Sequence, residues 1–491
     1  MVYRNRSKSF LSKHSKKSDE KVHFKSASKK KSKSKGKKRF RIYWRYISII
    51  WILWLGLIYY HESAVVKRAM KKCQWSAWEK WPKGAESHRV GLFADPQIMD
   101  EYSYPKRPQI VNYFTRVLVD HYHKRNWKYV QYYLDPDSSF FLGDLFDGGR
   151  NWGDEQWIKE YTRFNQIFPK KPMRRTVMSL PGNHDIGFGD TVVESSLERF
   201  SAYFGETSSF LEAGNHTFVL LDTISLSDKA NPNVSRIPME FLNNFARSSH
   251  PYPRILLTHV PLWRNPTQQT CGKLRESKDP FPIHKGVQYQ TIINEGISQQ
   301  VLTKIQPEIL FSGDDHDYCH ITHSYQSQGE NKIAEEVTVK SCAMNMGISR
   351  PAIQLLSLYN PSDLRTVNAG EDHESKTYQT ELCYMPDPYK AIIMYLWGLL
   401  FSTAFVLYMH FFPKSFNFYV ATRMDRLLTR PDSGSSDLPL PTSVSKSKSK
   451  KSLVHSKYAV NDTRSIKQFI ANAAVILLAV ITIFVYFYTV I

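Results

Sequence analysis

Three apolar runs without Asp, Glu, Lys or Arg constrain this chain more than any other feature of its sequence. They cover residues 46–60, 391–413 and 469–491, and the last two are 23 residues long. A helix that crosses a bilayer needs about 20 such residues. The first run is shorter, but Arg45 before it can reach the headgroups, and its Trp and Tyr residues suit the interface. We therefore predict three transmembrane helices, over residues 46–61, 391–413 and 469–491.

Two other interpretations of these runs fit less well. A cleaved signal peptide would not have about 45 residues before its apolar core, and no small-residue cleavage site follows the first run. A signal for attaching a glycolipid anchor would not follow a second span and a basic loop, as residues 469–491 do. We expect the first run to act as a signal anchor and the last as a span.

Lys and Arg are concentrated in two segments that border the apolar runs. Residues 1–45 contain 18 Lys and Arg against two acidic residues, and residues 413–467 contain 11 against four. Because basic segments stay on the cytoplasmic side, we predict a disordered cytoplasmic tail over residues 1–45 and a cytoplasmic loop over residues 414–467. Residues 62–389 are then lumenal. The rest of the chain holds 37 basic and 39 acidic residues, so we expect no nucleic-acid partner.

Sequons and cysteines agree with this topology. Sequons begin at Asn215 and Asn233 in the lumenal segment, and a third at Asn461 lies in the cytoplasmic loop, where it should stay unmodified. All five cysteines lie between residues 62 and 389. Their odd number permits at most two internal disulfides and one free thiol, and the sequence leaves the pairing open.

Short apolar runs alternate with helical patterns between residues 89 and 358. Expected strands cover residues 89–95, 138–144, 175–180, 216–222, 254–259, 307–313, 336–341 and 352–358, and expected helices include 108–123, 154–168 and 238–247. Continuous apolar strands separated by helices indicate an α/β fold with buried sheets. We assign residues 89–389 to one lumenal domain, preceded by a linker over residues 62–88.

Five of these strands end directly at side chains that can bind metal. In chain order these residues are Asp95, Asp144, Asn183, His259 and Asp314 with His316. A single Asp at a strand end is usually a helix cap or a turn residue, but five such ends are hard to obtain by chance. Because binding sites in open α/β sheets lie at the carboxyl ends of the strands, the sequence predicts a metal site there.

The ordered blocks resemble the signature of the calcineurin-like metallophosphoesterase superfamily, which is D-x-H, G-D-x-x-D, G-N-H-[DE], a lone His after a strand, and G-H-x-H. The second, third and fourth blocks match at residues 143–147, residues 182–185 and His259. The first and fifth depart, with Gln97 and Asp314 where the family has histidines. The resemblance implies a β-sandwich flanked by helices, in addition to the three transmembrane helices.

The family pattern also implies a site for two divalent metal ions. Asp144 would bridge them. Asp95 and His316 would complete the shell of one ion, with the Gln97 carbonyl as a further donor, and the other ion would be held by Asn183, His259 and Asp314.

Other residues of the blocks would support the chemistry. In the family pattern His184 projects beside the metals, where it would stabilise the phosphate or protonate the leaving alkoxide. Asp147 and Asp185 would orient the ligands. Replacing two imidazoles by Gln and Asp makes the site rich in oxygen, which favours Mn²⁺ or Mg²⁺ over Zn²⁺, so manganese is the expected ion. We expect His284, His320 and His323 to be structural or surface residues.

The motifs, framed by membrane spans, look like the branch of this superfamily that acts on ethanolamine-phosphate groups of glycosylphosphatidylinositol (GPI) anchors. That likeness implies a phosphodiesterase that removes this group from a mannose of the GPI glycolipid or of GPI-anchored proteins during anchor remodelling. It also implies the endoplasmic reticulum membrane, with the Golgi as the alternative. Two other functions stay open: a metallophosphatase for another lipid-linked or soluble phosphate ester, and a non-catalytic relative that binds metal or glycolipid.

Overall fold

The domain that carries the predicted site is built on two β-sheets. The computed structural model describes residues 41–361, 376–428, 458–460 and 465–490. One sheet has five strands in the order β13-β12-β1-β2-β3, and the other has six in the order β10-β11-β9-β6-β5-β4. The first contains β1 (His88–Phe93), β2 (Ser138–Phe141), β3 (Arg175–Val177), β12 (Ala352–Leu358) and β13 (Tyr378–Tyr384). The second contains β4 (Ser209–Ala213), β5 (His216–Leu220), β6 (Arg254–Leu257), β9 (Ile309–Ser312), β10 (Cys319–Ser327) and β11 (Glu330–Thr338).

The strands that lead to the predicted ligands run parallel within each sheet. β1, β2 and β3 form one parallel set, and β5, β6, β9 and β11 form the other. Val90 and Leu92 of β1 belong to an apolar cluster shared by both sheets. In the same cluster, the rings of Phe140 and Phe218 stack across the two sheets at 4.7 Å. β2, β5 and β9 are buried on both faces, which explains their continuous apolar runs.

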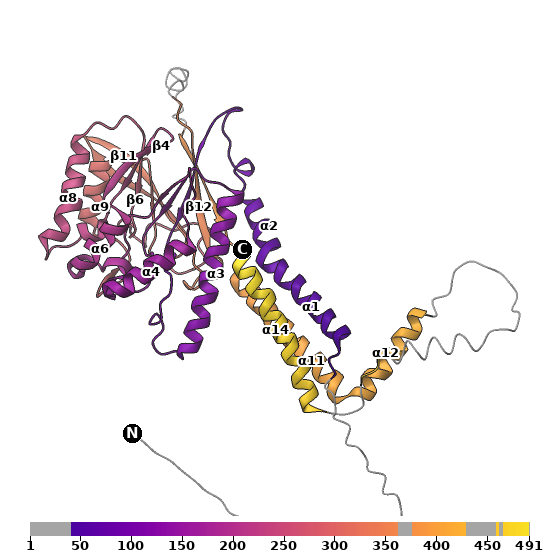
Figure 1. The fold of residues 1–491 in the computed structure, drawn as a ribbon. Helices are drawn as coiled ribbons and strands as arrows, with labels where there is room; N and C mark the ends of the chain where they lie inside the picture. The colour runs from indigo at the N-terminus through magenta and orange to yellow at the C-terminus, as the bar shows by residue number, and fades with distance from the viewer. Residues whose placement is uncertain (1–40, 362–375, 429–457, 461–464, 491) are drawn as a thin grey trace, which may run out of the picture. The chain divides into compact units, whose positions relative to one another are not determined.

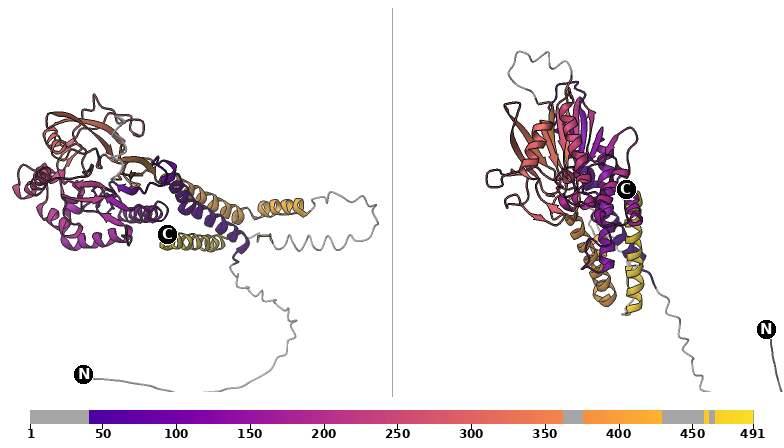
Figure 2. Two further views of the ribbon diagram at one scale, coloured as in Figure 1. Left: turned by 90° about the horizontal axis from the view of Figure 1, so that it is seen from above. Right: turned by 90° about the vertical axis from the view of Figure 1, so that its left-hand side faces the viewer.

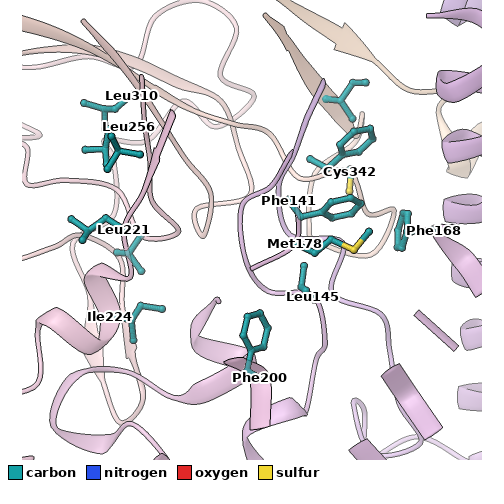
Figure 3. Close-up of a cluster of buried hydrophobic side chains, with 14 of the residues drawn as sticks. Phe141, Leu145, Phe168, Met178, Phe200, Leu221, Ile224, Leu256, Leu310 and Cys342 are labelled. Atoms are coloured by element: carbon teal, nitrogen blue, oxygen red, sulfur yellow. The ribbon is translucent and has the colours of Figure 1, made fainter. Parts of the chain in front are cut away.

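Helices cover the outer faces of the sandwich (Figure 1), and Figure 3 shows buried apolar side chains of the domain. The ring of Phe141 on β2 contacts Trp127 of α3 and Phe164 of α4. Leu256 of β6 and Leu310 of β9 lie in the same apolar cluster as residues of α8 and α9. This arrangement confirms the predicted α/β sandwich flanked by helices. The helices of the domain are α3 (Gln109–Tyr133), α4 (Asp154–Ile167), α5 (Asn183–Ile186), α6 (Glu194–Phe204), α7 (Thr223–Leu226), α8 (Pro232–Arg247) and α9 (Glu295–Ile305).

Some elements depart from the pattern that the sequence predicts. β4, β10 and β13 are not predicted, because their residues do not form a continuous apolar run; in β10 buried and exposed residues alternate strictly. A short hairpin is formed by β7 (Lys285–Gly286) and β8 (Tyr289–Gln290). Single helical turns form at Trp75–Ala77 (η2), Gly149–Asn151 (η3) and Gly189–Thr191 (η4). α3 continues ten residues beyond its expected end at residue 123.

Within the described residues, three helices are long and apolar enough to cross a membrane. The first joins α1 (Trp44–Tyr59), a π-helical turn η1 (Tyr60–Ala64) and α2 (Val65–Lys72). The others are α11 (Pro388–Phe411) and α14 (Ile466–Val490), and α12 (Pro413–Leu428) follows α11. The three lie side by side (Figure 2). The first helix extends into the expected linker, because Val66 and Met70 are buried and nothing interrupts the helix before Cys73.

A buried carboxylate joins the candidate membrane helices to the domain. Glu62 of η1 is 3% exposed, and one of its oxygens lies 2.5 Å from Arg125 Nη1 and 2.8 Å from His121 Nε2, both on α3. Its other oxygen accepts a hydrogen bond of 2.6 Å from the Tyr395 hydroxyl on α11. Because Arg125 is also buried, this carboxylate is its charge partner within the fold.

Glu62→Ala is expected to destabilise the full chain by about 3–5 kcal/mol, because it leaves the guanidinium of Arg125 buried without an anion. The matched control is Glu240→Ala, which removes an exposed pair with Arg236 and should cost less than about 1 kcal/mol. Thermal unfolding in lipid nanodiscs measures both. Equal unfolding temperatures for the two variants would show that the Glu62 contacts do not stabilise the chain.

Two disulfides and one free thiol account for the five cysteines. Cys73 pairs with Cys383 and Cys271 with Cys319, while Cys342 is free and buried. The first bond links the end of the helix that contains α1 to β13, 310 residues further along the chain. It therefore ties the two ends of the domain together next to the candidate membrane helices.

Candidate metal centre

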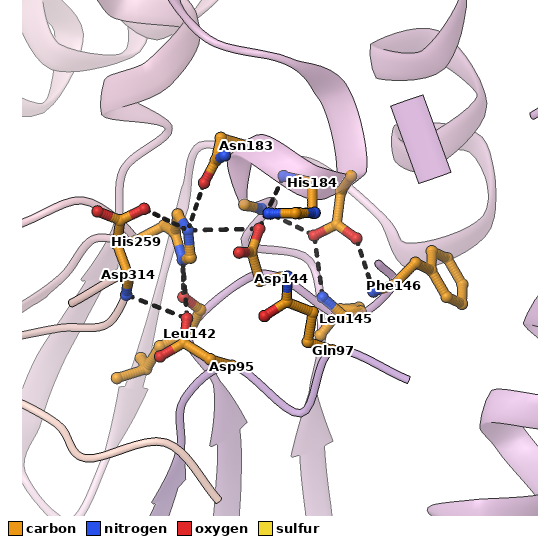
Figure 4. A network of polar contacts seen from close by, with 12 residues as sticks. Asp95, Gln97, Leu142, Asp144, Leu145, Phe146, Asn183, His184, His259 and Asp314 are labelled. Carbon is orange, nitrogen blue, oxygen red and sulfur yellow. Dashed lines mark hydrogen bonds and ion pairs between the residues drawn. The ribbon is translucent and has the colours of Figure 1, made fainter. Parts of the chain in front are cut away.

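Buried polar side chains from both sheets meet at the carboxyl ends of the parallel strands (Figure 4). Asp95 follows β1, Asp144 follows β2, and Asn183 opens α5 after β3; from the other sheet, His259 follows β6 and Asp314 follows β9. Each of the five is at most 8% exposed. The structure thus brings together five of the six predicted metal ligands from distant parts of the sequence.

His259 has one nitrogen directed into this cluster as an acceptor. Its Nδ1 lies 2.7 Å from the Leu142 carbonyl oxygen. A carbonyl only accepts, so Nδ1 carries the hydrogen and Nε2 carries a lone pair. Three oxygens face that nitrogen: Asp144 Oδ1 at 3.4 Å, Asn183 Oδ1 at 3.4 Å and Asp314 Oδ1 at 3.6 Å. One imidazole nitrogen and three oxygens around one point form a donor set suited to a divalent cation.

A second group of donors shares Asp144. Ligand atoms of Asp95, Asp144 and His259 all lie within 4.8 Å of one another. Asp95 Oδ1 accepts a hydrogen bond of 3.0 Å from the Asp314 backbone N–H. Asp95 Oδ2, Asp314 Oδ2 and Gln97 Oε1 are buried without a hydrogen-bond partner. Buried oxygens need a partner, and a cation would satisfy these three, so the residues present fit the metal ions that the sequence predicts.

The pKa shifts of the three buried carboxyl groups also favour a bound cation. Burial first, and the nearby Asp144 carboxylate second, raise the pKa of Asp95 well above its ordinary value, and the same causes raise the pKa of Asp314. Burial acts in the same direction on Asp144, but the charge that His259 and His184 carry when protonated, together with the hydrogen bond from the His184 backbone N–H, outweighs it and lowers the pKa of Asp144. Burial lowers the pKa of His259, which keeps it a neutral ligand. Divalent ions would let all three carboxylates ionise together.

The backbone at the site adopts conformations that non-glycine residues rarely take. Of the eleven non-glycine residues with positive φ in the described part of the chain, five belong to the predicted site. They are Asp95, Gln97, Asp144, Asp314 and His316. Such conformations cost about 1–3 kcal/mol each and cluster at functional sites. Here they turn the chain sharply at the strand ends, so that the side chains point toward one another.

Two glycines allow the loops to approach closely. Gly143 has φ +90°, and a Cβ there would lie 2.5 Å from His259 Nδ1. At Gly182 a Cβ would lie 2.1 Å from Asp144 Oδ1. Neither position has room for a side chain. Steric exclusion therefore explains why glycine precedes Asp144 in the G-D block and Asn183 in the G-N block.

Residues beside the clustered side chains hold the surrounding loops in place. The Asp185 carboxylate accepts hydrogen bonds from the backbone N–H groups of Leu145, Phe146 and Gly182, which fixes the loop after β2. Asp147 accepts a hydrogen bond of 3.0 Å from Gln97 Nε2.

The partly exposed His184 lies between these loops. Its backbone N–H donates to Asp144 Oδ1 at 2.8 Å, and its Nδ1 donates to the Asp147 carbonyl oxygen at 2.7 Å. Because Nδ1 is hydrogen-bonded, Nε2 is the ring nitrogen that can contact a substrate.

The remaining histidines are placed differently. His316 is less buried than the five clustered residues, and its ring lies outside the tight group of Asp95, Asp144 and His259. Its imidazole interacts electrostatically with Asp144, and burial lowers the pKa of His316 to about 4. Its role as a ligand remains a prediction. His284 and His320 are exposed, and His323 is paired with Glu336 inside the six-stranded sheet.

Two contacts at the site are not predicted from the sequence. Arg150 Nη1 donates to the Asn183 carbonyl oxygen at 2.8 Å, and the Gln288 carbonyl oxygen accepts from Asn183 Nδ2 at 3.3 Å. Arg150 follows the second motif directly, which is a signal that could have identified it. Gln288 lies in the β7–β8 hairpin, where no sequence pattern marks it.

A family model and several known proteins are similar to this chain. The family model for calcineurin-like phosphoesterases matches residues 88–318. Cell division control protein 1 of Saccharomyces cerevisiae is 82% identical over 491 residues, which is the full length of both chains. Metallophosphoesterase 1 of Xenopus laevis is 25% identical, and the match covers 74% of this chain and 89% of that protein. A solved structure of phosphopantetheinyl hydrolase from Mycobacterium tuberculosis has 12% identity and a TM-score of 0.27, covering 51% and 89% of the two chains, which is too low to carry an argument.

Proposed function

This chain belongs to the calcineurin-like phosphoesterase family, and from that premise we propose that it is a membrane-anchored, metal-dependent phosphodiesterase that removes an ethanolamine-phosphate group from a mannose of GPI anchors. The family assignment and the three candidate spans give the coarser description, a phosphoric ester hydrolase with membrane-spanning helices. The GPI substrate, manganese, the endoplasmic reticulum or Golgi membrane and the lumenal orientation belong to the proposal.

One observation carries the proposal: the ligand-bearing strand ends belong to a domain held to membrane helices on both sides. The Cys73–Cys383 disulfide and the contacts of Glu62 fix that attachment. A soluble phosphate ester does not require it. A lipid-linked phosphodiester gains from it, because substrate and site then share one surface.

The chain's own residues divide the work of hydrolysis. Asp95, Asp144, Asn183, His259 and Asp314 would hold the metal ions, with His316 and the Gln97 carbonyl beside them. When bound, two such ions neutralise phosphoryl charge and supply an activated water as nucleophile.

Protonation of the leaving group is assigned to His184. The Asp147 carboxylate lies 3.4 Å from His184 Nδ1, on the side of the ring opposite Nε2. His184 Nε2 can then deliver its proton to the mannose oxygen as the ester bond breaks.

The direct test uses full-length chain in lipid nanodiscs, Mn²⁺ and GPI intermediates, with the products identified by mass spectrometry. The expected result is loss of one ethanolamine-phosphate group, and none with Asp144→Asn. If the mass stays unchanged while the same preparation cleaves a soluble phosphodiester, the substrate assignment is wrong and the more general phosphoesterase function stands.

The lumenal orientation makes a prediction about glycosylation. Asn215 and Asn233 are both exposed on the domain and should carry glycans, whereas Asn461, which lies outside the described residues, should not. The gel mobility of the single Asn→Gln variants, with and without glycosidase treatment, shows which of these residues carry glycans. A mobility shift that depends on Asn461 would contradict the three-span topology.

The departures from the family motif make a prediction about the metal. Gln97→His combined with Asp314→His adds two imidazoles and removes a negative charge, so activity with Zn²⁺ or Fe²⁺ should rise relative to Mn²⁺. The measurement is hydrolysis of a soluble phosphodiester across a series of divalent ions. An unchanged preference would show that these two positions do not select the metal.

A further inference from the structure

We propose that the N-terminal half of α3 is a membrane-docking element that inserts into the same leaflet as the C-terminal end of α14. We call this half of the helix, together with Tyr102 in the loop before it, the α3 tip; its apolar residues are Tyr102, Ile110, Val111, Tyr113, Phe114 and Leu118. Their exposed fractions run from 38% at Leu118 to 72% at Tyr102. Residues 108–115 contain no charged side chain. Contiguous exposed apolar side chains of this size mark a binding surface rather than an ordinary water-facing helix.

The α3 tip is an ordered part of the fold. Asn112 is buried, and its Nδ2 donates hydrogen bonds to the carbonyl oxygens of Tyr104 at 2.9 Å and Glu101 at 3.4 Å. The Asp100 carboxylate accepts from the Tyr102 backbone N–H at 2.7 Å and from Trp152 Nε1 at 2.7 Å. These bonds fold the preceding loop back onto the helix, so the apolar surface does not result from a frayed helix end.

Contacts between α3 and α14 place the tip at the level of the membrane. Lys128 Nζ donates to the Val490 carbonyl oxygen at 2.7 Å. Seven residues earlier on α3, the His121 ring lies 5.3 Å from the Tyr488 ring and 5.6 Å from the Phe484 ring. Positions nearer the start of α3 therefore lie beside positions of α14 that are further from its C-terminal end and deeper in its apolar span.

The tip continues in that direction. From His121 to Ile110 the helix extends a further ~16 Å, and Figure 1 shows this half of α3 leaving the body of the domain. The pairing of Arg125 with Glu62 fixes the direction of α3 relative to the first membrane helix.

The residues around the tip suit lipid rather than a second protein. Lys106 and Arg107 precede it, and the Arg107 guanidinium lies 3.8 Å from the Tyr104 ring, an arrangement suited to phosphate headgroups at the interface. The tip is also continuous with a candidate span through Tyr488 and Phe484. A protein partner would have to lie within or against the bilayer to cover it.

Docking at the tip would set the position of the metal centre above the membrane. Only four residues separate Gln97 from Tyr102. Ser103 hydrogen-bonds both Asp100 and Asp147, and Asp147 binds Gln97 and the ring of His184. That consequence for a lipid-linked substrate rests on the proposed function, whereas the docking itself does not.

The test measures membrane depth without turnover. Ile110→Cys and the control Ile237→Cys, which replaces an isoleucine 53% exposed on α8, are labelled with a fluorophore in the full chain and placed in nanodiscs with acyl-chain nitroxide lipids. Labelling is specific, because Cys342 is buried and the other cysteines form disulfides. We expect severalfold stronger quenching at position 110. Equal quenching at both positions, or shielding at 110 without lipid quenching, as a second copy or partner protein would produce, overturns the proposal.

A second pair of variants separates docking from substrate specificity. Ile110→Glu should raise the KM for a bilayer-embedded phosphodiester severalfold and leave hydrolysis of soluble bis-p-nitrophenyl phosphate unchanged, and Ile237→Glu should change neither. Equal KM values for the two variants with the embedded substrate overturn the docking. Strong quenching at position 110 without any GPI hydrolysis overturns the proposed function and leaves the docking intact.

Discussion

Gly182→Ala is expected to abolish metal binding and to lower phosphodiester hydrolysis by about 10²-fold or more, because a misplacement of about 1 Å at a reacting site costs that much. The added Cβ would lie 2.1 Å from Asp144 Oδ1 and 2.2 Å from the Asp144 backbone nitrogen. The φ of Gly182 is −106°, which alanine adopts freely, so the effect is a collision and not backbone strain. Asp144 has to leave the position from which it faces His259.

Gly153→Ala is the matched control for this prediction. Gly153 precedes α4 with φ −74°, and a Cβ there meets no atom within 4 Å. Bound metal, measured by mass spectrometry of the elements, and thermal unfolding are compared for both variants. The steric account of the G-N block fails if Gly182→Ala keeps as much metal as Gly153→Ala.

Asp144→Asn and His184→Ala should both lose activity, but for different reasons. Asp144→Asn keeps the shape and removes the charge that two ions would share, so bound metal should fall together with hydrolysis. His184→Ala removes the proton donor but no predicted ligand, so kcat should fall about 10²–10⁴-fold while metal content stays unchanged. Loss of metal in the His184 variant as severe as in the Asp144 variant would refute this division of roles.

The part of this site that could be predicted from the sequence follows from one geometric fact. Parallel strands end at a common edge, so Asp95, Asp144 and His259 could be grouped without any knowledge of their contacts. The apolar strands were recognisable because strands such as β2, β5, β9 and β12 are buried on both faces. The same reasoning misses β10, since its exposed face is polar and its pattern alternates.

Other features depend on tertiary contacts that no local pattern encodes. The carbonyl of Gln288 reaches Asn183 from a hairpin more than 100 residues away. Cys73 pairs with Cys383 across a sequence separation of 310 residues. The first candidate membrane helix continues to Lys72 because Val66 and Met70 are buried, and a hydrophobicity pattern that ends at residue 60 does not reveal this.

Anomalous diffraction from crystals of the full chain grown with Mn²⁺ tests the central claim most directly. We expect two manganese peaks about 3.5–4 Å apart with the Asp144 carboxylate between them. One should lie beside Asp95, and the other should be bonded to His259 Nε2. A single peak, or peaks away from the ends of β1, β2, β6 and β9, would contradict the assignment of these residues as a two-metal hydrolytic centre.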